Sequence, residues 1–388
     1  MRKIKKIVYC TGTRADYGLA RPVLFELKKK KFKVELLVTG MHLMPEFGHT
    51  IDEVRNDGFK IHEIKAVFED DRKESSSLFV GKCESQMAEK LVKIKPDLVL
   101  VLGDRAEMLA ATIAASYLGI AVAHMRGGEI TSTIDDPVRH AITRLAHIHL
   151  CTTPGSAERL RRMGEQDFRI DKVGDPGLDS VIKISRSLDD TKKDKLAKRF
   201  LIDRKKPLAI MIQHSVSVEE SRAAEQAKET LLALNDLRIE MHLQILVIYP
   251  CADAGGRSII REIERFRSKE GFKIFKNIAH SDFIGIMSLA DVIVGNSSSG
   301  ITETASLKTA TVNIGTRQLG REQNPNVIDS GYDRREIRQK IKIALSADFR
   351  KRIDGRNIYG DGKAAVRIAR RIGLVNIDKR LMQKRLAY

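Results

Sequence analysis

Acidic, basic and histidine side chains gather in one stretch of the chain, residues 97–149. A short apolar run at 98–102 suits a strand buried on both faces of a parallel sheet, and Gly103-Asp104 ends it. A second strand is predicted at 120–125, and Arg126-Gly127-Gly128-Glu129 follows it. Ligands of open α/β sheets bind beyond the carboxyl ends of the strands, so we expect these charged side chains at a ligand site.

The next predicted helix opens at Asp136-Pro137, with Asp136 as its N-cap and Pro137 at the first helical position. Positioned carboxylates can act as general acids and bases, so three of them are candidate catalytic residues: Asp104, Glu129 and Asp135. Candidate substrate-binding residues of the same region are Arg105, Arg126 and His140. The alternative to a functional site is a structural loop held by ion pairs, because ion-pair networks also bring charged side chains together.

A second stretch with chemical potential is GNSSSGITE at 295–303, between a predicted strand and a predicted helix. Small residues there let backbone amides approach a phosphate, and the helix dipole favours negative charge. The sequence is neither a Walker motif nor GxGxxG, and the alternative is an ordinary serine-rich helix cap. The candidate nucleotide-binding residues are Ser297, Ser298, Ser299, Gly300 and Glu303, whose carboxylate could accept from a ribose diol.

Further candidates follow other predicted strands. Arg14 lies in a Gly-Thr-Arg turn after the first strand, where a phosphate contact competes with a structural salt bridge. His214 ends a strand and is a catalytic candidate, with a satisfied core histidine as the alternative. Arg317 could supply charge to a diphosphate; for Arg321, which follows, a surface position explains the residue equally well. Asp253, in the loop after the strand at 243–249, is a further binding candidate.

These residues require two α/β domains to position them. A length of 388 residues favours two domains. Strands and helices alternate over 1–185 and again over 207–360, with the last strand expected at 311–314. We expect a charged linker at 186–206 and a C-terminal helical tail at 361–388 that could pack back on the first domain. The predicted fold is two Rossmann-like, doubly wound domains that face each other across a cleft.

Composition restricts the class of protein. The net charge is +18, but only 5% of the residues are aromatic, so base-stacking platforms are poorly supplied and we expect no nucleic-acid partner. No apolar run approaches the ~20 residues of a membrane span, and the N-terminus lacks the features of a signal peptide. The four cysteines have no metal-type spacing. Reduced thiols and a cytoplasmic location are therefore expected, with no metal.

Six motifs, in order, resemble those of the hydrolysing UDP-N-acetylglucosamine 2-epimerases, in particular their sialic-acid branch. They are TGTRADYG at 11–18, GDR at 103–105, GGEITSTIDDPVRHAITRLAHIH at 127–149, QHSV at 213–216, GNSSSGITE at 295–303 and NIGTRQLGRE at 313–322. The resemblance covers nearly the whole chain and implies a GT-B fold with the nucleotide held mainly by the C-terminal domain.

The resemblance also assigns roles. Asp104 matches a catalytic carboxylate, His214 the catalytic histidine and Asp135 an acidic position of the Asp-Asp pair. Contacts to UDP are implied for Arg14, Ser297, Ser298, Glu303 and Arg317. The chain departs from the pattern at Arg126, where the animal enzyme resembles His-Ile-Glu with a catalytic Glu, so Glu129 is expected to take over. It departs again at Cys251, which replaces an asparagine.

The function that follows is elimination of UDP across C1 and C2 to a glycal, followed by hydration to the C2-inverted free sugar. UDP-N-acetylglucosamine going to N-acetylmannosamine is the expected reaction. The alternative substrate is a UDP-2,4-diacetamido-2,4,6-trideoxy sugar of the legionaminic acid pathway, and a GT-B glycosyltransferase ranks below both. The route needs no cofactor, and we expect a UDP-sugar substrate, no membrane partner, and a homodimer or homotetramer.

Overall fold

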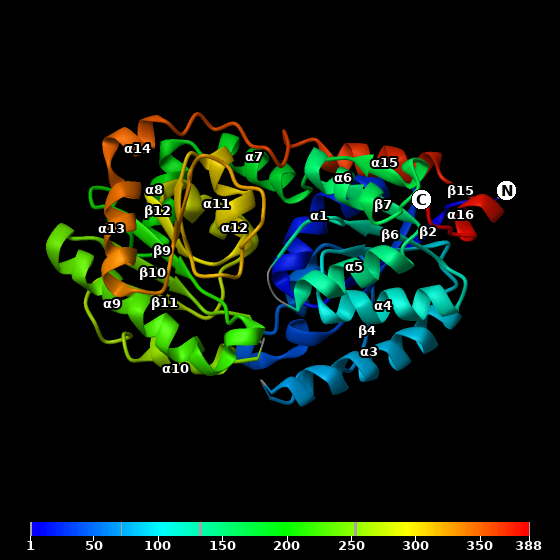
Figure 1. The fold of residues 1–388 in the computed structure, drawn as a ribbon, viewed down its shortest axis with the longest axis horizontal. Helices are drawn as coiled ribbons and strands as arrows, with labels where there is room; N and C mark the ends of the chain where they lie inside the picture. The colour runs from blue at the N-terminus through cyan, green and yellow to red at the C-terminus, as the bar shows by residue number, and fades with distance from the viewer. Residues whose placement is uncertain (1, 71, 132–133, 252–253, 388) are drawn as a thin grey trace. The chain divides into compact units, whose positions relative to one another are not determined.

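The computed structural model describes residues 2–70, 72–131, 134–251 and 254–387, which form two compact units (Figure 1). The described residues of 1–130, 134–179 and 359–388 make the N-terminal unit. Those of 131–133 and 180–358 make the C-terminal unit. Each unit contains its own parallel β-sheet with helices on both faces, and each is described here by itself.

The N-terminal unit is built on a seven-stranded parallel sheet of order β4-β3-β2-β5-β6-β7-β8. Chain order thus runs outward from β2 in one direction and then, from β5, in the other, as in a doubly wound Rossmann sheet. The central strand β5 has the sequence LVLVL and is buried along its whole length. The strands are β2 (Lys6–Thr11), β3 (Lys33–Val38), β4 (Lys60–Glu63), β5 (Leu98–Leu102), β6 (Ala121–Met125), β7 (Ile148–Cys151) and β8 (Ile170–Lys172).

Helices connect these strands and cover both faces of the sheet. They are α1 (Arg14–Lys29), α2 (Ile51–Asn56), α3 (Lys73–Ile94), α4 (Ala106–Tyr117), α5 (Asp135–Leu145) and α6 (Pro154–Arg162). Helix α7 (Gly177–Ser187) follows β8, and from residue 180 on it belongs to the C-terminal unit. The predicted cap of α5 is wrong by two residues. The helix begins at Asp135 with Ile134 at the N-cap, so both aspartates lie in its first turn, where the helix dipole favours negative charge.

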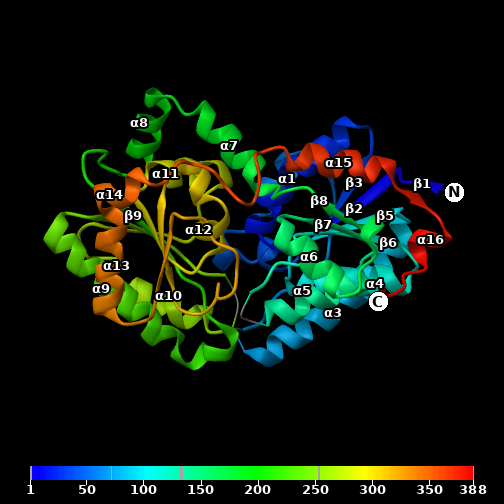
Figure 2. The same ribbon diagram turned by 45° about the horizontal axis from the view of Figure 1, so that its top comes forward.

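The C-terminal end of the chain returns to the N-terminal unit. Helix α15 (Ala364–Leu374) packs beside α1, as Figure 2 also shows. Strand β15 (Asn376–Ile377) then pairs antiparallel with β1 (Arg2–Lys3). A short helix, α16 (Lys379–Met382), and residues up to 387 follow.

The C-terminal unit repeats the same topology in a six-stranded parallel sheet of order β11-β10-β9-β12-β13-β14. A core on one face packs α9 and α13 against the sheet, with Leu234, Val247 and Ile337 fully buried. The strands are β9 (Leu208–Ile212), β10 (Gln244–Ile248), β11 (Phe272–Phe275), β12 (Val292–Gly295), β13 (Ala310–Ile314) and β14 (Val327–Ser330).

The helices of this unit are α8 (Asp190–Arg199), α9 (Ala223–Met241), α10 (Gly256–Glu264), α11 (His280–Leu289), α12 (Ser298–Thr302), α13 (Arg334–Leu345) and α14 (Ala347–Lys351). One feature differs from the sequence-based expectation. A further strand, β14, follows the strand at 311–314 that was expected to be last. The segment 186–206 contains the end of α7 and all of α8, which packs against α11.

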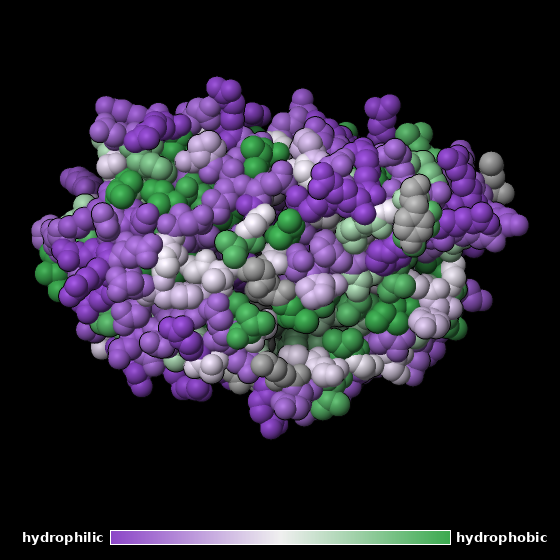
Figure 3. Space-filling view, in the orientation of Figure 1, coloured by the Kyte–Doolittle hydropathy of each residue, from purple (hydrophilic) through white to green (hydrophobic). Residues whose placement is uncertain are grey.

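The surface is rich in charge. The face drawn in Figure 3 is mostly hydrophilic, with hydrophobic residues in scattered patches, which agrees with a charged content of 31%. Among the described residues, no helix is long and apolar enough to cross a membrane.

Candidate functional site

The order of the N-terminal sheet reverses between β2 and β5, which is where a doubly wound sheet offers a crevice to ligands. The loops after these two strands carry Arg14 and Asp104-Arg105. Arg14 opens α1, just after the N-cap Thr13, whose hydroxyl and backbone form a capping box with Asp16. Arg105 is the N-cap residue of α4. Three of the predicted site residues therefore lie at the switch point of this sheet.

Beneath these loops lies a buried carboxylate, Glu107. It accepts a hydrogen bond of 2.7 Å from Arg105 Nε, and burial raises its pKa. Gly12 lies directly against it, since a Cβ there would come within 1.9 Å of Glu107 Oε1. The Thr11–Arg14 turn therefore needs a glycine at this point. One donor of Arg105 is used to hold this carboxylate.

The two predicted catalytic carboxylates Asp104 and Glu129 meet at one guanidinium. Arg139 of α5 donates from Nη2 to Asp104 Oδ2, and its Nη1 lies 3.9 Å from Glu129 Oε2. The same Nη1 donates to the carbonyl oxygen of Arg126 at 3.1 Å. Thr152, after β7, donates to Glu129 Oε1 at 2.9 Å. Arg139 is 2% exposed, so this arrangement is built into the unit rather than formed on its surface.

His124 of β6 fixes the loop that carries Asp104. Its Nε2 lies 2.7 Å from the carbonyl oxygen of Gly103, which can only accept, so Nε2 carries the proton. Its Nδ1 then accepts from the hydroxyl of Thr143 on α5 at 3.2 Å. Burial lowers the pKa of His124 to about 3, so the ring is neutral. Helix α5 thus contacts the Asp104 loop both through Arg139 and through Thr143.

Arg126 is bound to a further buried carboxylate, Asp175. It follows β6 with a left-handed backbone, φ 62°. Its Nη2 donates to Asp175, which is fully buried and also accepts from the backbone of Gly177 at 2.8 Å. The following Gly128 also needs its residue type, because a Cβ there would lie 2.4 Å from the carbonyl oxygen of Ser156. The loop is therefore tightly packed, and Arg126 spends one donor on Asp175.

The first turn of α5 carries the remaining N-terminal candidates. Asp135 and Asp136 are its first two residues and are partly exposed. His140, one turn later, has Nε2 3.4 Å from Asp136 Oδ2, and burial lowers the pKa of its ring. These three side chains stand on the same short helix as Arg139.

The C-terminal sheet reverses between β9 and β12, and one side chain joins the two strand ends there. Asn296 accepts from the amide of His214 at 2.7 Å and donates to the carbonyl oxygen of His214 at 2.9 Å. The amide of Cys251, after β10, donates to His214 Nδ1 at 3.1 Å. A neutral His214 therefore carries its proton on Nε2, which makes that nitrogen a hydrogen-bond donor.

The loop after β13 meets the same asparagine. The backbone carbonyl oxygen of Asn296 accepts from Arg317 Nη1 at 3.3 Å and from Gln318 Nε2 at 2.9 Å. Asn296 is 1% exposed and so connects three strand ends from inside the unit. Arg321 donates to Gln318 Oε1 at 3.0 Å, which ties it to the same loop.

The serine loop turns directly after Asn296. Gly295 has φ 131°, and a Cβ there would lie 2.1 Å from the carbonyl oxygen of Ile212, so the strands can approach only with glycine. Ser297 caps α12, its hydroxyl accepting from Ser299 N at 3.4 Å, and Ser298 and Gly300 lie in the helix. Helix α12 has only five residues, and the buried Glu303 follows it.

The carboxylate of Glu219 also stabilises the loop after β13. Glu219, in the 3-10 turn after His214, accepts from Thr316 Oγ1 at 2.6 Å and from Tyr332 OH at 2.7 Å. Gln226 Nε2 donates to the same carboxylate at 2.6 Å. The segments that carry His214 and Arg317 are thus fastened to each other twice, through Asn296 and through Glu219.

The predicted residues therefore form two groups, one in each unit, and none of their roles is tested by the geometry alone. Asp253 lies outside the described residues. Sequence analysis missed the residues that connect each group, Arg139, Asn296 and Glu107. A signal existed for two of them: Arg139 lies one turn after Asp135, and Asn296 directly follows a strand. Among the described residues, no group of three His, Cys, Asp or Glu is arranged to hold a metal ion.

Residues 26–373 match the family model described as UDP-N-acetylglucosamine 2-epimerase. A relative from Legionella pneumophila, named UDP-N,N'-diacetylbacillosamine 2-epimerase (hydrolyzing), is 37% identical over 99% of this chain and 100% of its own length. One from Campylobacter jejuni, named GDP/UDP-N,N'-diacetylbacillosamine 2-epimerase (hydrolyzing), is 30% identical over 89% of each chain. One from Neisseria meningitidis, named UDP-N-acetylglucosamine 2-epimerase, is 31% identical over 88% of each chain.

Solved structures show the same fold. The Neisseria meningitidis UDP-GlcNAc 2-epimerase bound to UDP-GlcNAc aligns with a TM-score of 0.79, at 19% identity, over 94% of this chain and 98% of that one. The Listeria monocytogenes structure described as a putative UDP-N-acetylglucosamine 2-epimerase aligns with a TM-score of 0.77, at 17% identity, over 96% of each chain. The expected fold class is confirmed: α/β and GT-B-like, with two Rossmann-like domains.

Proposed function

Because the chain belongs to the UDP-N-acetylglucosamine 2-epimerase family and is an enzyme of the hydrolysing kind, we propose that its substrate is a UDP-2,4-diacetamido-2,4,6-trideoxyhexose. The products are UDP and the free sugar inverted at C2. One observation carries the choice of sugar: the likeness to the Legionella relative is 37% over essentially both whole chains. The Campylobacter relative, whose name includes the same sugar, supports it.

UDP-N-acetylglucosamine, the substrate preferred from the sequence alone, is the second candidate. The Neisseria relative, at 31% identity over 88% of this chain, supports it. The two sugars differ at C4 and C6, where an acetamide and a methyl replace two hydroxyls. A site that donates to or accepts from both hydroxyls would keep unpaired polar groups with the diacetamido sugar, so a single site cannot suit both sugars equally.

The chemistry proposed is elimination followed by hydration. The C2 proton of the sugar goes to an enzyme base, the C1–O bond breaks with its electron pair going to UDP, and a C1=C2 double bond forms. Water then adds its hydroxyl to C1 while a proton returns to C2 from the opposite face. In the overall reaction, the UDP-sugar and one water molecule give UDP and the free sugar inverted at C2. Each proton transfer requires a positioned acid or base.

The N-terminal unit supplies the carboxylates in this proposal. Asp104 and Glu129 share Arg139, which holds both near one point of the sheet edge. A base and an acid at adjacent positions suit a reaction that removes and returns a proton at one carbon. Asp135 is the third candidate.

The C-terminal unit binds the nucleotide in this proposal. Arg317 and the hydroxyls of Ser297 and Ser298 are donors that suit a diphosphate. His214 receives a backbone hydrogen bond on Nδ1, so its neutral ring offers Nε2–H as a donor. This supports His214 as an acid or hydrogen-bond donor to the leaving diphosphate rather than as the base for C2. Arg14 and Arg105 of the N-terminal unit remain proposed substrate ligands.

The test is a comparison of kcat/KM on the two UDP-sugars, with no acceptor present, measuring both UDP release and the free sugar. The GDP-linked diacetamido sugar is the matched control for the nucleotide. We expect the UDP-diacetamido sugar to be preferred by more than about tenfold, which corresponds to ~1.4 kcal/mol in transition-state binding. In D2O the product should carry deuterium at C2.

A preference of the same size for UDP-N-acetylglucosamine would make the second candidate the substrate. Release of UDP only when an acceptor sugar is added would instead indicate a glycosyltransferase. If none of these nucleotide sugars is turned over, the proposed function is wrong.

A further inference from the structure

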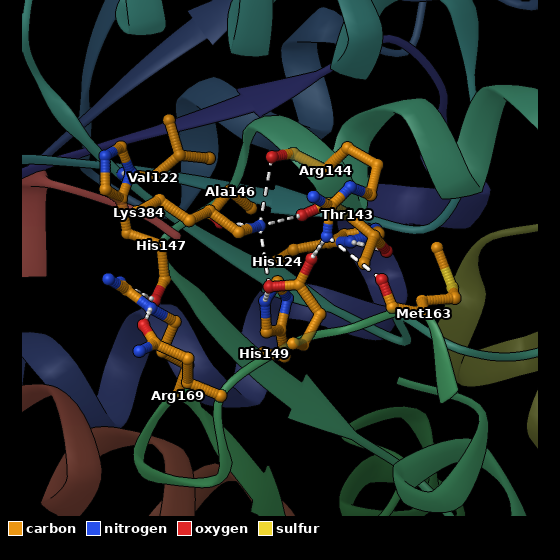
Figure 4. Close-up of polar contacts among 12 residues, drawn as sticks. Val122, His124, Thr143, Arg144, Ala146, His147, His149, Met163, Arg169 and Lys384 are labelled. Carbon is orange, nitrogen blue, oxygen red and sulfur yellow. Dashed lines mark hydrogen bonds and ion pairs between the residues drawn. The ribbon is translucent and has the colours of Figure 1, made fainter. Parts of the chain in front are cut away.

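A lysine near the C-terminus is built into the N-terminal unit, far in sequence from the predicted site residues. Lys384 follows α16, and its side chain is 13% exposed. Its ammonium group donates to the carbonyl oxygens of Thr143 and Ala146 at 2.7 Å each and of Arg144 at 3.0 Å (Figure 4). It also lies 2.7 Å from Glu165 Oε2. Three N–H groups are thus shared among four acceptors.

The three carbonyls belong to the C-terminal end of α5. The last carbonyls of a helix have no partner within the helix, and the negative end of the helix dipole favours a cation there. Lys384 therefore caps the C-terminal end of α5, although it lies 241 residues from Thr143 in the sequence. The end of α5 is held at a defined position in the unit.

Glu165, the carboxylate paired with Lys384, is itself held by further contacts. Glu165 accepts from Arg144 Nη1 and lies 2.8 Å from His149 Nε2. Burial lowers the pKa of Lys384 to about 8, and the Glu165 carboxylate opposes that shift. Removing one member of a buried ion network is costly, because the remaining charges stay buried without a compensating partner.

The segment that carries Lys384 is also fastened by its backbone. Arg169 Nη1 donates to the carbonyl oxygens of Leu381 at 2.8 Å and of His147 at 3.1 Å, and Nη2 donates to that of Arg380 at 2.9 Å. Beyond the lysine, the amide of Ala387 donates to the carbonyl oxygen of Gly164 at 2.8 Å. Lys384 is held on both sides, so its ammonium group is a fixed support for α5.

Helix α5 transmits this support to the Asp104 loop by two routes. Arg139 donates to Asp104 and to the carbonyl oxygen of Arg126. Thr143, whose own carbonyl receives Lys384, donates from its hydroxyl to His124, and His124 donates to the carbonyl oxygen of Gly103. A shift of α5 along or about its axis would move both contacts at once.

We propose that Lys384 is a positioning residue for the reaction, holding α5 so that Arg139 and Thr143 keep Asp104 in its reactive position. The assignment rests on the proposed function for what Asp104 does, but the mechanical link from Lys384 to Gly103–Arg105 is independent of the substrate. Loss of the support affects the proton transfer more than nucleotide binding, because the serine loop and Arg317, which supply most of the predicted UDP-binding donors, belong to the C-terminal unit, whereas only Arg105 lies in the supported loop.

The test compares Lys384→Met, Lys384→Arg and the control Lys379→Met, which removes an exposed charge from the same terminal segment. We expect Lys384→Met to lower kcat by about 10- to 100-fold, as misplaced catalytic groups do, while UDP affinity changes by no more than a few fold. Lys384→Arg keeps a multiple donor and should recover part of the rate. Lys379→Met should match the parent protein.

Hydrogen exchange provides the readout that does not depend on turnover. In Lys384→Met, amides of α5 and of residues 103–105 should exchange at least about tenfold faster, while those of β5 stay protected and show that the unit is folded. A substrate deuterated at C2 should show a larger isotope effect on kcat, because proton transfer becomes slower.

A rate of Lys384→Met within twofold of the parent protein would overturn the proposal, and so would unchanged exchange at residues 103–105. The outcome for the proposed function is separate. If the parent protein turns over none of the nucleotide sugars, the function fails, and the exchange experiment alone decides whether Lys384 supports the Asp104 loop.

Discussion

The switch points of the two sheets hold their groups by different physical means. In the N-terminal unit, charged side chains are positioned by other charged side chains, with Arg139 between Asp104 and Glu129. In the C-terminal unit, the partners are mostly neutral groups: the Asn296 amide contacts His214 twice, its backbone carbonyl accepts from Gln318, and the Glu219 carboxylate accepts from the neutral side chains of Thr316, Tyr332 and Gln226. The same strand order thus supports two kinds of site.

The difference matches what each unit is proposed to do. Charged networks set where a carboxylate lies and how strongly it holds a proton, which is what acid–base chemistry requires. A neutral amide fixes backbone geometry without adding charge of its own. It therefore suits a site whose ligand, a diphosphate, brings charge with it. If this interpretation is right, changes in the first unit should alter turnover, and changes in the second should alter binding.

The largest effect is expected for Asp104→Asn. The amide keeps an oxygen for Arg139 but loses the acid–base function, so kcat should fall by about 100-fold or more, while UDP affinity stays within a few fold. Steady-state kinetics and calorimetry with UDP measure the two quantities. Asp167→Asn, at a carboxylate that is 79% exposed in the same unit, is the control. Near-normal turnover in Asp104→Asn would make the aspartate structural and would remove the basis of the comparison.

A smaller effect is expected when donors of the C-terminal unit are removed. Arg317→Ala and Ser298→Ala should each weaken UDP binding by about 1–3 kcal/mol, the cost of a lost charge-assisted hydrogen bond. Arg335→Ala removes an exposed arginine of the same unit and should leave the affinity unchanged. Unchanged affinity in both Arg317→Ala and Ser298→Ala, measured by calorimetry, would refute the assignment of this loop to the nucleotide.

Much of the scaffold could be predicted because its signals are local. Buried strands such as LVLVL are continuous apolar runs, and the residue after each run marks the sheet edge where ligands bind. Strand β14 was missed because its four residues, VIDS, are mixed in polarity and only one of them is buried. The start of α5 was misplaced because Pro137 favours, but does not require, the first helical position.

The connections within each group could not be predicted in the same way. Arg139 reaches Asp104 across 35 residues, and no periodicity in the sequence specifies that pairing. The direction of Arg126 depends on its left-handed backbone and on Asp175, 49 residues later. Lys384 was expected only as part of the C-terminal helical tail at 361–388. In each case a local pattern places a residue at an element, whereas tertiary packing decides which side chains it meets.

The smallest expected effect is a loss of folding stability at low pH, caused by buried histidines of the N-terminal unit. Burial lowers the pKa of His42 and His147 to about 4 and that of His124 to about 3. Each folded-state pKa lies below the unfolded value of about 6.5, so between the two the unfolded chain binds more protons. Stability is therefore full above pH 6.5 and is lost as the pH falls from 6.5 toward 4.

For His124 alone, the loss between pH 7.0 and pH 5.5 should be about 1.3 kcal/mol, since one pKa unit corresponds to 1.36 kcal/mol. Hydrogen exchange of β5 and β6 at both pH values measures the local opening free energy, and His124→Gln should show a loss smaller by about that amount. His242→Asn, at an exposed position of the C-terminal unit with φ 54°, is the control, because asparagine tolerates this backbone. An equal loss in His124→Gln and the parent protein would mean that His124 is protonated in the folded state, and its hydrogen bonds to Gly103 and Thr143 would then need another explanation.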